Sequence, residues 1–204
     1  MLYEIRSAPR VVLVDPKCSQ LASLPFFYHL WPEYDEQCGK WTSPLVGDYF
    51  GKHLKGHLRV AIHFRSFHKE NLELLCGMML PLKNCILAVD ELGLFLSPGP
   101  AGALPRNVTS IVVSGTHDGI TLIGTAQRPS LVHGTVRSNA SRMLFYRLTE
   151  RADLEIARGY LPADFAERLA SLPDFVPIDH ADNRDPFEDA SLVGKLKKYL
   201  PGNR

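Results

Sequence analysis

The chain has 204 residues, of which 45% are hydrophobic and 22% are charged, ordinary values for one soluble globular domain. Lysine and arginine (23) nearly balance aspartate and glutamate (22), so the overall charge does not point to nucleic-acid binding. Four cysteines without a CxxC pair argue against a zinc site or a disulfide framework. No apolar run approaches the ~20 residues that would span a membrane.

The N-terminal part of the chain is predicted to form two strands and one helix. Residues 10–17 (RVVLVDPK) are apolar and β-branched until Asp-Pro ends them, and residues 57–64 (HLRVAIHF) form a second such run. Between them, residues 19–57 are rich in proline and aromatic side chains and are expected to be irregular. Residues 66–82 open with a serine cap and carry leucine and methionine at helical spacing, which predicts a helix.

The central part of the chain contains the most distinctive strand. Residues 84–90 hold the apolar run Ile-Leu-Ala-Val, which is short and continuous, as in strands buried on both faces of a parallel sheet. A loop rich in proline and glycine is expected over residues 93–102, then a helix over 104–119 and another buried strand over 120–126. Strands that alternate with helices predict a doubly wound, mainly parallel α/β sheet.

The C-terminal part is predicted to complete this domain and to end in a tail. We expect a short helix over residues 130–140, a fifth strand of the sheet over 142–148 and a helix over 162–172. The sequence then becomes polar and acidic, and a basic stretch, KLKK, follows. The predicted organisation is one α/β domain over residues 1–178 and a polar tail, with room for a short basic helix, over 179–204.

Polar side chains end three of the predicted strands: Asp15 with Lys17, Asp90 with Glu91, and Gln127. Ligands of parallel sheets bind beyond the carboxyl ends of the strands, so these groups should converge. Four apolar residues followed by Asp-Glu is the pattern of a Walker B strand, whose aspartate holds Mg²⁺ and whose glutamate polarises the water that attacks ATP. Gln127 would then sense the γ-phosphate. An Asp-Glu pair is also common at the ends of ordinary strands. Asp15 with Lys17 could equally mark a strand that is simply stopped by the intervening proline.

The stretches VVLVDPK, ILAVDE and VVSGTHDGITLIGTAQRPSLVHGTVRSNASRMLFYRL resemble the HerA/FtsK superfamily of DNA-pumping ATPases, including its viral genome-packaging branch. They resemble more loosely the zonula-occludens-toxin-like assembly proteins of filamentous phages. The resemblance implies a three-layer, RecA-like α/β fold of the additional-strand P-loop class. It also implies ATP and Mg²⁺ as cofactors. On the matching positions Asp90 is the Mg²⁺ ligand, Glu91 the catalytic base and Gln127 the sensor, and Asp15 and Lys17 lie near the nucleotide.

One departure from the family concerns its arginine. The family commonly carries an arginine in the turn before the sensor strand, where this chain has Thr116. An arginine finger would therefore come from another position. Arg137, just past the sensor strand, is the preferred candidate because a subunit edge could present it to a neighbour. Arg128 and Arg142 are alternatives, and each of the three could simply be a surface ion-pair residue.

A second departure is the absence of a Walker A motif, GxxxxGK[ST]. The nearest string, GDYFGKH (47–53), has three residues between its glycines and His53 in place of Ser or Thr. We expect the phosphate-binding strand and loop to lie roughly 20–40 residues upstream, the size of an ordinary βα unit, in a chain that is truncated or mis-started here. The alternative is a degenerate family member. Loss of a central strand should leave neighbouring backbone groups unpaired, at roughly 1–3 kcal/mol each if unsolvated.

The sequence therefore predicts two alternative functions. The first is a DNA-translocating or genome-packaging ATPase that works as a homo-oligomeric ring, often a hexamer, on double-stranded DNA. The second is a non-hydrolysing structural or adaptor protein on the same fold. The expected partners include viral capsid or plasmid-transfer proteins, and the expected location is cytoplasmic or virion-associated.

Overall fold

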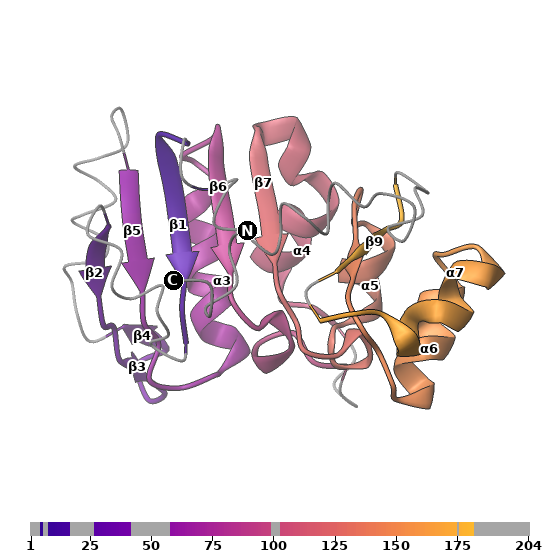
Figure 1. Ribbon diagram of the computed structural model, residues 1–204. Helices are drawn as coiled ribbons and strands as arrows, with labels where there is room; N and C mark the ends of the chain where they lie inside the picture. The colour runs from indigo at the N-terminus through magenta and orange to yellow at the C-terminus, as the bar shows by residue number, and fades with distance from the viewer. Residues whose placement is uncertain are drawn as a thin grey trace, which may run out of the picture. The chain divides into compact units, whose positions relative to one another are not determined.

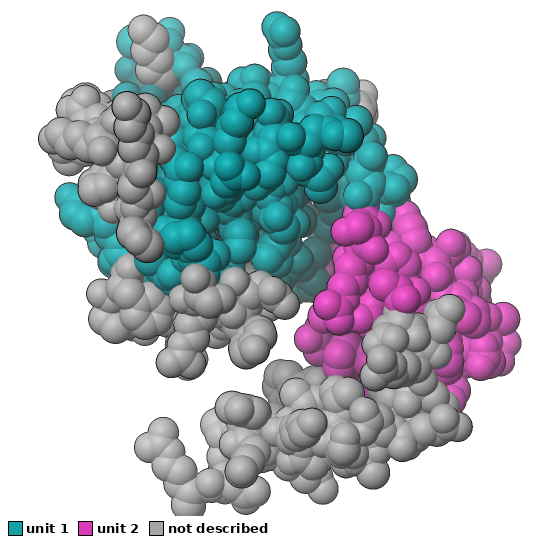
Figure 2. Space-filling view, turned by 90° about the horizontal axis from the view of Figure 1, so that it is seen from above, with its two compact units in different colours: residues 1–127, 131–139 teal, residues 128–130, 140–204 magenta. Residues whose placement is uncertain are grey.

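The computed structural model describes the chain in six stretches: residues 5, 8–16, 27–41, 58–98, 103–174 and 176–181. The chain divides into two compact units, shown in different colours in Figure 2. Unit 1 contains residues 1–127 and 131–139, and unit 2 contains residues 128–130 and 140–204.

Unit 1 is built on a five-stranded sheet in the order β2-β5-β1-β6-β7, in which every pairing is parallel (Figure 1). The strands are β1 (Arg10–Val14), β2 (Tyr28–Leu30), β5 (Leu58–Ile62), β6 (Cys85–Val89) and β7 (Ile120–Gly124). The mainly parallel α/β sheet predicted from the sequence is confirmed.

The three inner strands are those with mainly apolar, buried sequences. β1, β5 and β6 read RVVLV, LRVAI and CILAV, and nearly all their side chains are buried. Runs of this kind fit the middle of a parallel sheet because both faces are covered there. β7 is an edge strand and is less buried, and its outer edge pairs with no strand among the described residues.

Helices cover one face of this sheet. They are α3 (Lys69–Met79) and α4 (Arg106–Ser114) (Figure 1). The short α5 (Gly134–Ser138) contributes Val136 to the apolar cluster that these helices form with the sheet. Leu72, Leu75 and Met79 of α3 pack with side chains of that face in the largest apolar cluster. A smaller cluster covers the other face and includes Ile5 and Phe27. The N-terminus of α4 has no side-chain cap of its own. The carboxylate of Glu73 in α3 accepts hydrogen bonds from free backbone amides at this end, so it links the two helices.

Two predictions for the sheet are wrong. The fifth strand is β2, which lies inside the segment expected to be irregular, and the predicted strand over residues 142–148 does not join the sheet. Only β8 (Leu144–Phe145) forms there, and it pairs antiparallel with β9 (Ile178–Asp179) in unit 2. The reason is its burial pattern, since Phe145 packs in the core of unit 2 while its neighbours Leu144 and Tyr146 are exposed.

Unit 2 has its own apolar core between the β8–β9 pair and the helices α6 (Arg151–Arg158) and α7 (Ala163–Arg168). A buried carboxylate joins two of its segments. Asp153 of α6 accepts hydrogen bonds from Ser130 N (2.8 Å) and Arg128 Nε (2.9 Å). Burial alone would raise the pKa of Asp153, but the bonds from Ser130 and the nearby guanidinium outweigh it, and the pKa lies below its ordinary value.

The remaining small elements are the β3–β4 hairpin (Tyr34–Asp35 and Lys40–Trp41) and short 3₁₀ turns. No helix in the described part of the chain is long and apolar enough to cross a membrane. The tail predicted over residues 179–204 falls mostly outside the described residues, so the boundary after residue 178 stays a prediction.

Replacement of Asp153 by alanine should destabilise unit 2 by about 1–3 kcal/mol, because Ser130 N and the guanidinium of Arg128 lose their buried acceptor. Hydrogen exchange of amides in residues 140–181 would measure this. The matched control is Glu155→Ala, which removes an exposed ion pair with Arg151 and should cost less than about 0.5 kcal/mol. Equal effects of the two substitutions would contradict the role given to Asp153.

Candidate functional site

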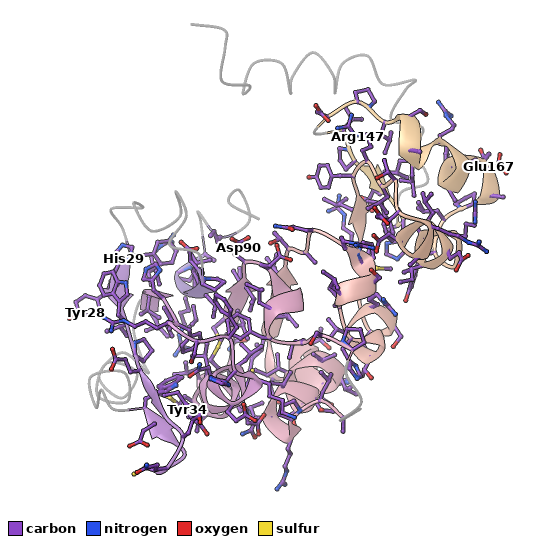
Figure 3. The ribbon with its side chains drawn as sticks, turned by 90° about the horizontal axis from the view of Figure 1, so that it is seen from below. Tyr28, His29, Tyr34, Asp90, Arg147 and Glu167 are labelled. Atoms are coloured by element: carbon purple, nitrogen blue, oxygen red, sulfur yellow. The ribbon has the colours of Figure 1, made fainter. Side chains whose placement is uncertain are left out.

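The carboxyl ends of the parallel strands bring the candidate residues together. Strand arrows of the sheet point down in Figure 1, so Figure 3, seen from below, looks onto these ends and shows Asp90 there. Val89 is in register with Gly124, and Asp90 and Thr125 are the next residues on the two strands. Asp90 N also donates to Val14 O (2.9 Å), which continues the pairing of β6 with β1.

Four residues form one hydrogen-bonded cluster at this edge, and we call it the Asp90 cluster: Asp90, Glu91, Thr125 and Gln127. The hydroxyl of Thr125 donates to Asp90 Oδ1 (2.6 Å) and accepts from Glu91 N (3.0 Å). The carboxylate oxygen Oε1 of Glu91 accepts from Gln127 N (3.1 Å). The structure thus brings together three residues singled out in the sequence and adds a fourth, Thr125.

The backbone of Glu91 lies in the left-handed region, with φ 59° and ψ 63°. This conformation is uncommon for a residue with a side chain and is often found at functional sites. It is maintained by bonds on both sides, since Leu92 N donates to Thr125 O (2.7 Å) and Glu91 N to the Thr125 hydroxyl. The sharp turn lets two consecutive carboxylates occupy the same end of the sheet.

Gly124 allows this turn to pack closely on β7. A Cβ at position 124 would lie 1.9 Å from Leu92 Cδ1 and 2.5 Å from Leu92 Cγ, so any larger residue would displace Leu92. Leu92 is buried and belongs to the main apolar cluster. The position of Glu91 therefore depends on packing as well as on hydrogen bonds.

Gln127 enters the cluster through its backbone amide, and the residue itself is exposed. Its side-chain amide is accordingly accessible at the end of β7, beside a carboxylate. This placement is compatible with the sensor role predicted from the sequence, which stays a prediction.

Asp15 has a different environment from Asp90. It directly follows β1, and it is fully buried. His63 Nδ1 lies 3.1 Å from the backbone oxygen of Asp15 and 4.0 Å from its Oδ2, and His63 Nε2 lies 3.0 Å from His29 Nδ1. Trp31 packs on His63, with ring centroids 5.0 Å apart. The carboxyl group of Asp15 thus lies beside a buried histidine. Neither histidine was singled out from the sequence.

The three candidate arginines have different environments, and Lys17 lies outside the described residues. Arg137 lies on α5 and is partly exposed. Arg128 pairs with Asp153, and Arg142 pairs with Asp179 at 2.6 Å. The two alternatives to Arg137 are therefore already engaged within unit 2, whereas the role of Arg137 as a finger stays a prediction.

Asp90 offers one carboxylate oxygen for a cation. The Thr125 hydroxyl occupies Oδ1, and no described residue donates a hydrogen bond to Oδ2. Among the described residues, no group of three or more His, Cys, Asp or Glu side chains could hold a metal ion by itself. One carboxylate suits Mg²⁺ that also binds water and nucleotide phosphates, because this ion is rarely enclosed by protein ligands alone.

Comparisons with known proteins identify a shared fold. No protein-family model matches the chain, and a sequence search of curated proteins finds no match. Among solved structures, it is similar to the genome packaging NTPase B204 from Sulfolobus turreted icosahedral virus 2 in complex with AMPPCP. The TM-score is 0.61 at 15% identity, over 84% of this chain and 76% of that chain.

Two further structures give the same result. The complex of that NTPase with ATP-gammaS also has a TM-score of 0.61 at 15% identity, with the same coverage. The DNA-packaging ATPase B204 from Sulfolobus Turreted Icosahedral Virus has a TM-score of 0.53 at 14% identity, over 84% of this chain and 91% of that chain. At this identity the likeness establishes that the chain has the fold of a viral packaging NTPase.

The stability of the protein should fall as the pH decreases below about 6.5. Burial lowers the pKa of His63 below its ordinary value of 6.5, against the opposing effect of Asp15. The unfolded chain then binds a proton that the folded chain excludes, so this histidine contributes fully above pH 6.5 and less below it, by at most about 1.4 kcal/mol per pH unit. Urea unfolding at pH 7.5 and 5.5 measures the change.

Two variants isolate this effect. His63→Asn should show a smaller loss of stability between pH 7.5 and 5.5 than the wild type, whatever its absolute stability. His117→Asn, at an exposed position, should keep the wild-type dependence. Aspartates with lowered pKa, such as Asp153 and Asp179, act only at much lower pH. An identical pH dependence in the His63 variant would contradict the prediction.

Proposed function

We propose that this chain is the core of a genome-packaging or DNA-translocating ATPase that hydrolyses ATP with Mg²⁺. The observation that carries the proposal is the Asp90 cluster, in which two carboxylates, a hydroxyl and a glutamine meet at the carboxyl ends of two parallel strands. Phosphoryl transfer depends mainly on positioning and on neutralisation of charge, which such a cluster can provide. The fold shared with packaging NTPases supports the same assignment.

Each residue of the cluster has a role in this proposal. Asp90 binds the cation through Oδ2, directly or through water, while its Oδ1 stays with Thr125. When bound, Mg²⁺ supplies positive charge that offsets the charge developing on the phosphates. Glu91 accepts a hydrogen bond from the attacking water and orients it. Gln127 places its exposed side-chain amide where it can contact the γ-phosphate.

The sequence contains no GxxxxGK[ST] motif, the usual phosphate-binding loop of such ATPases. The outer edge of β7 pairs with no described strand and leaves backbone groups available for another one. We propose that a further segment supplies both a strand at this edge and the loop. The backbone amides of such a loop would cradle the phosphates next to the Asp90 cluster.

We infer the nucleotide, the nucleic acid and the partners from the sequence resemblance and from the names of the structural neighbours. Those neighbours are described as genome-packaging NTPases and were solved with AMPPCP, ATP-gammaS, AMP or sulfate. By analogy, we propose ATP as the nucleotide and double-stranded DNA as the substrate moved. A HerA/FtsK-type homo-oligomeric ring, a capsid partner and a cytoplasmic or virion-associated location belong to the same proposal.

A non-hydrolysing adaptor on the same fold is the second candidate. The missing phosphate-binding motif favours it, because the cluster alone would bind nucleotide weakly. We expect the 204-residue chain by itself to turn over ATP negligibly. The same chain preceded by a glycine-rich phosphate-binding loop should hydrolyse ATP, with stimulation by double-stranded DNA. Absence of hydrolysis from that longer protein would favour the adaptor.

In the protein that carries the loop, Glu91→Gln should reduce kcat by 10²-fold or more while nucleotide affinity stays within about threefold. Glutamine can still accept the bond from Gln127 N but is a much weaker base towards water. Asp90→Ala should weaken Mg²⁺–nucleotide binding as well. The control is Glu155→Gln on α6 of unit 2, which should behave as wild type. Unchanged turnover in Glu91→Gln would refute the assigned base.

Arg137→Ala should lower turnover only in an assembled oligomer, because the proposed finger acts on the neighbouring subunit's site. Mixing this variant with Glu91→Gln should restore part of the activity, since some interfaces then pair an intact Glu91 with an intact Arg137. Steady-state ATPase assays on mixtures at several ratios would measure this. Activity that never exceeds that of the separate variants would rule out a finger in trans at Arg137.

A further inference from the structure

Thr125 occupies the centre of the Asp90 cluster, although neither its residue type nor its position marked it in the sequence. Its single hydroxyl proton is donated to Asp90 Oδ1 at 2.6 Å, a short distance expected for a bond to a carboxylate. The oxygen of the same hydroxyl accepts the amide proton of Glu91 at 3.0 Å. One side chain therefore contacts both members of the carboxylate pair.

The hydroxyl and the backbone of Thr125 make different hydrogen bonds. The backbone amide donates to Val89 O (3.1 Å) and the backbone oxygen accepts from Leu92 N (2.7 Å), and these bonds join the ends of β6 and β7. They remain when the side chain is replaced by a residue of the same shape. Valine in place of Thr125 thus removes only the two bonds of the hydroxyl.

The consequences of that loss fall on the two carboxylates. Without the hydroxyl, Asp90 Oδ1 has no donor among the described residues and its side chain is free to rotate. The amide of Glu91 loses its acceptor while the residue stays in a left-handed conformation that needs support from its surroundings. Both effects alter the direction in which the carboxylates point.

We propose that Thr125 is a positioning residue that fixes the Asp90 carboxylate so that Oδ2 is presented to a divalent cation, and holds Glu91 beside Gln127. This inference rests on the proposed function, since it assigns cation binding to Asp90. It requires that cation binding at Asp90 depend on the hydroxyl at position 125 and be insensitive to the hydroxyl of Thr121, which is exposed on the same strand.

The test uses Mn²⁺ as a paramagnetic probe on the 204-residue chain, with backbone amide NMR signals as the readout. In the wild type, submillimolar Mn²⁺ should broaden the signals of residues 90, 91 and 125 before those of residues 85 and 120, at the opposite ends of β6 and β7. Thr125→Val should need roughly tenfold more Mn²⁺ for equal broadening, the size expected when a hydrogen bond to a charged group is lost. Thr125→Ser should restore the wild-type response to within about twofold, and Thr121→Val should leave it unchanged.

The outcomes separate the inference from the proposed function. No selective broadening in the wild type, or equal responses of wild type and Thr125→Val, would overturn the inference. Equal weakening by Thr125→Val and Thr121→Val would also overturn it, because the effect would then belong to β7 as a whole. Selective, hydroxyl-dependent Mn²⁺ binding without ATP hydrolysis by the loop-bearing protein would support Thr125 and reject the ATPase.

Discussion

The parallel register of β6 on β7 is the constraint on which the proposed site depends. Val89 lies opposite Gly124, so the residues that follow on each strand, Asp90 and Thr125, come within hydrogen-bonding distance. A shift of one residue would exchange the two faces of the strand and separate these groups. The register is fixed by burial, because most of β6 is enclosed on both faces and cannot slide without exposing apolar side chains.

Two polar clusters lie at the carboxyl edge of the sheet, and they differ in accessibility. Around His63, a carboxyl group and two histidines from three neighbouring strands are packed under Trp31, and Asp15 is fully buried. The Asp90 cluster is internally bonded in the same way but leaves one carboxylate oxygen and an exposed glutamine available. This difference, rather than the number of charges, is the reason for placing the chemistry at Asp90.

Much of the fold and part of the site could be predicted from the sequence. Mainly apolar runs identify β1, β5 and β6, and parallel pairing explains why Asp90, Glu91 and Gln127 meet. Thr125 could not be identified from the sequence, because its role depends on the register between β6 and β7, which no local sequence pattern specifies. A three-residue strand such as β2 gives too short a signal. No helix was predicted at α6, whose short sequence RADLEIAR interleaves polar and apolar residues. The strand expected over 142–148 does not join the five-stranded sheet, because its alternating apolar residues belong to the separate small core of unit 2.

A crystal structure of the loop-bearing protein with Mg²⁺ and ATP-gammaS tests the role of the Asp90 cluster most directly. We predict that the cation lies at Asp90 Oδ2, bound directly or through water, with the γ-phosphate between Glu91 and the side chain of Gln127. The added strand should pair with the outer edge of β7. Nucleotide bound elsewhere, for example in the hollow between Phe67, Leu104 and His133, with the Asp90 cluster unchanged, would contradict it.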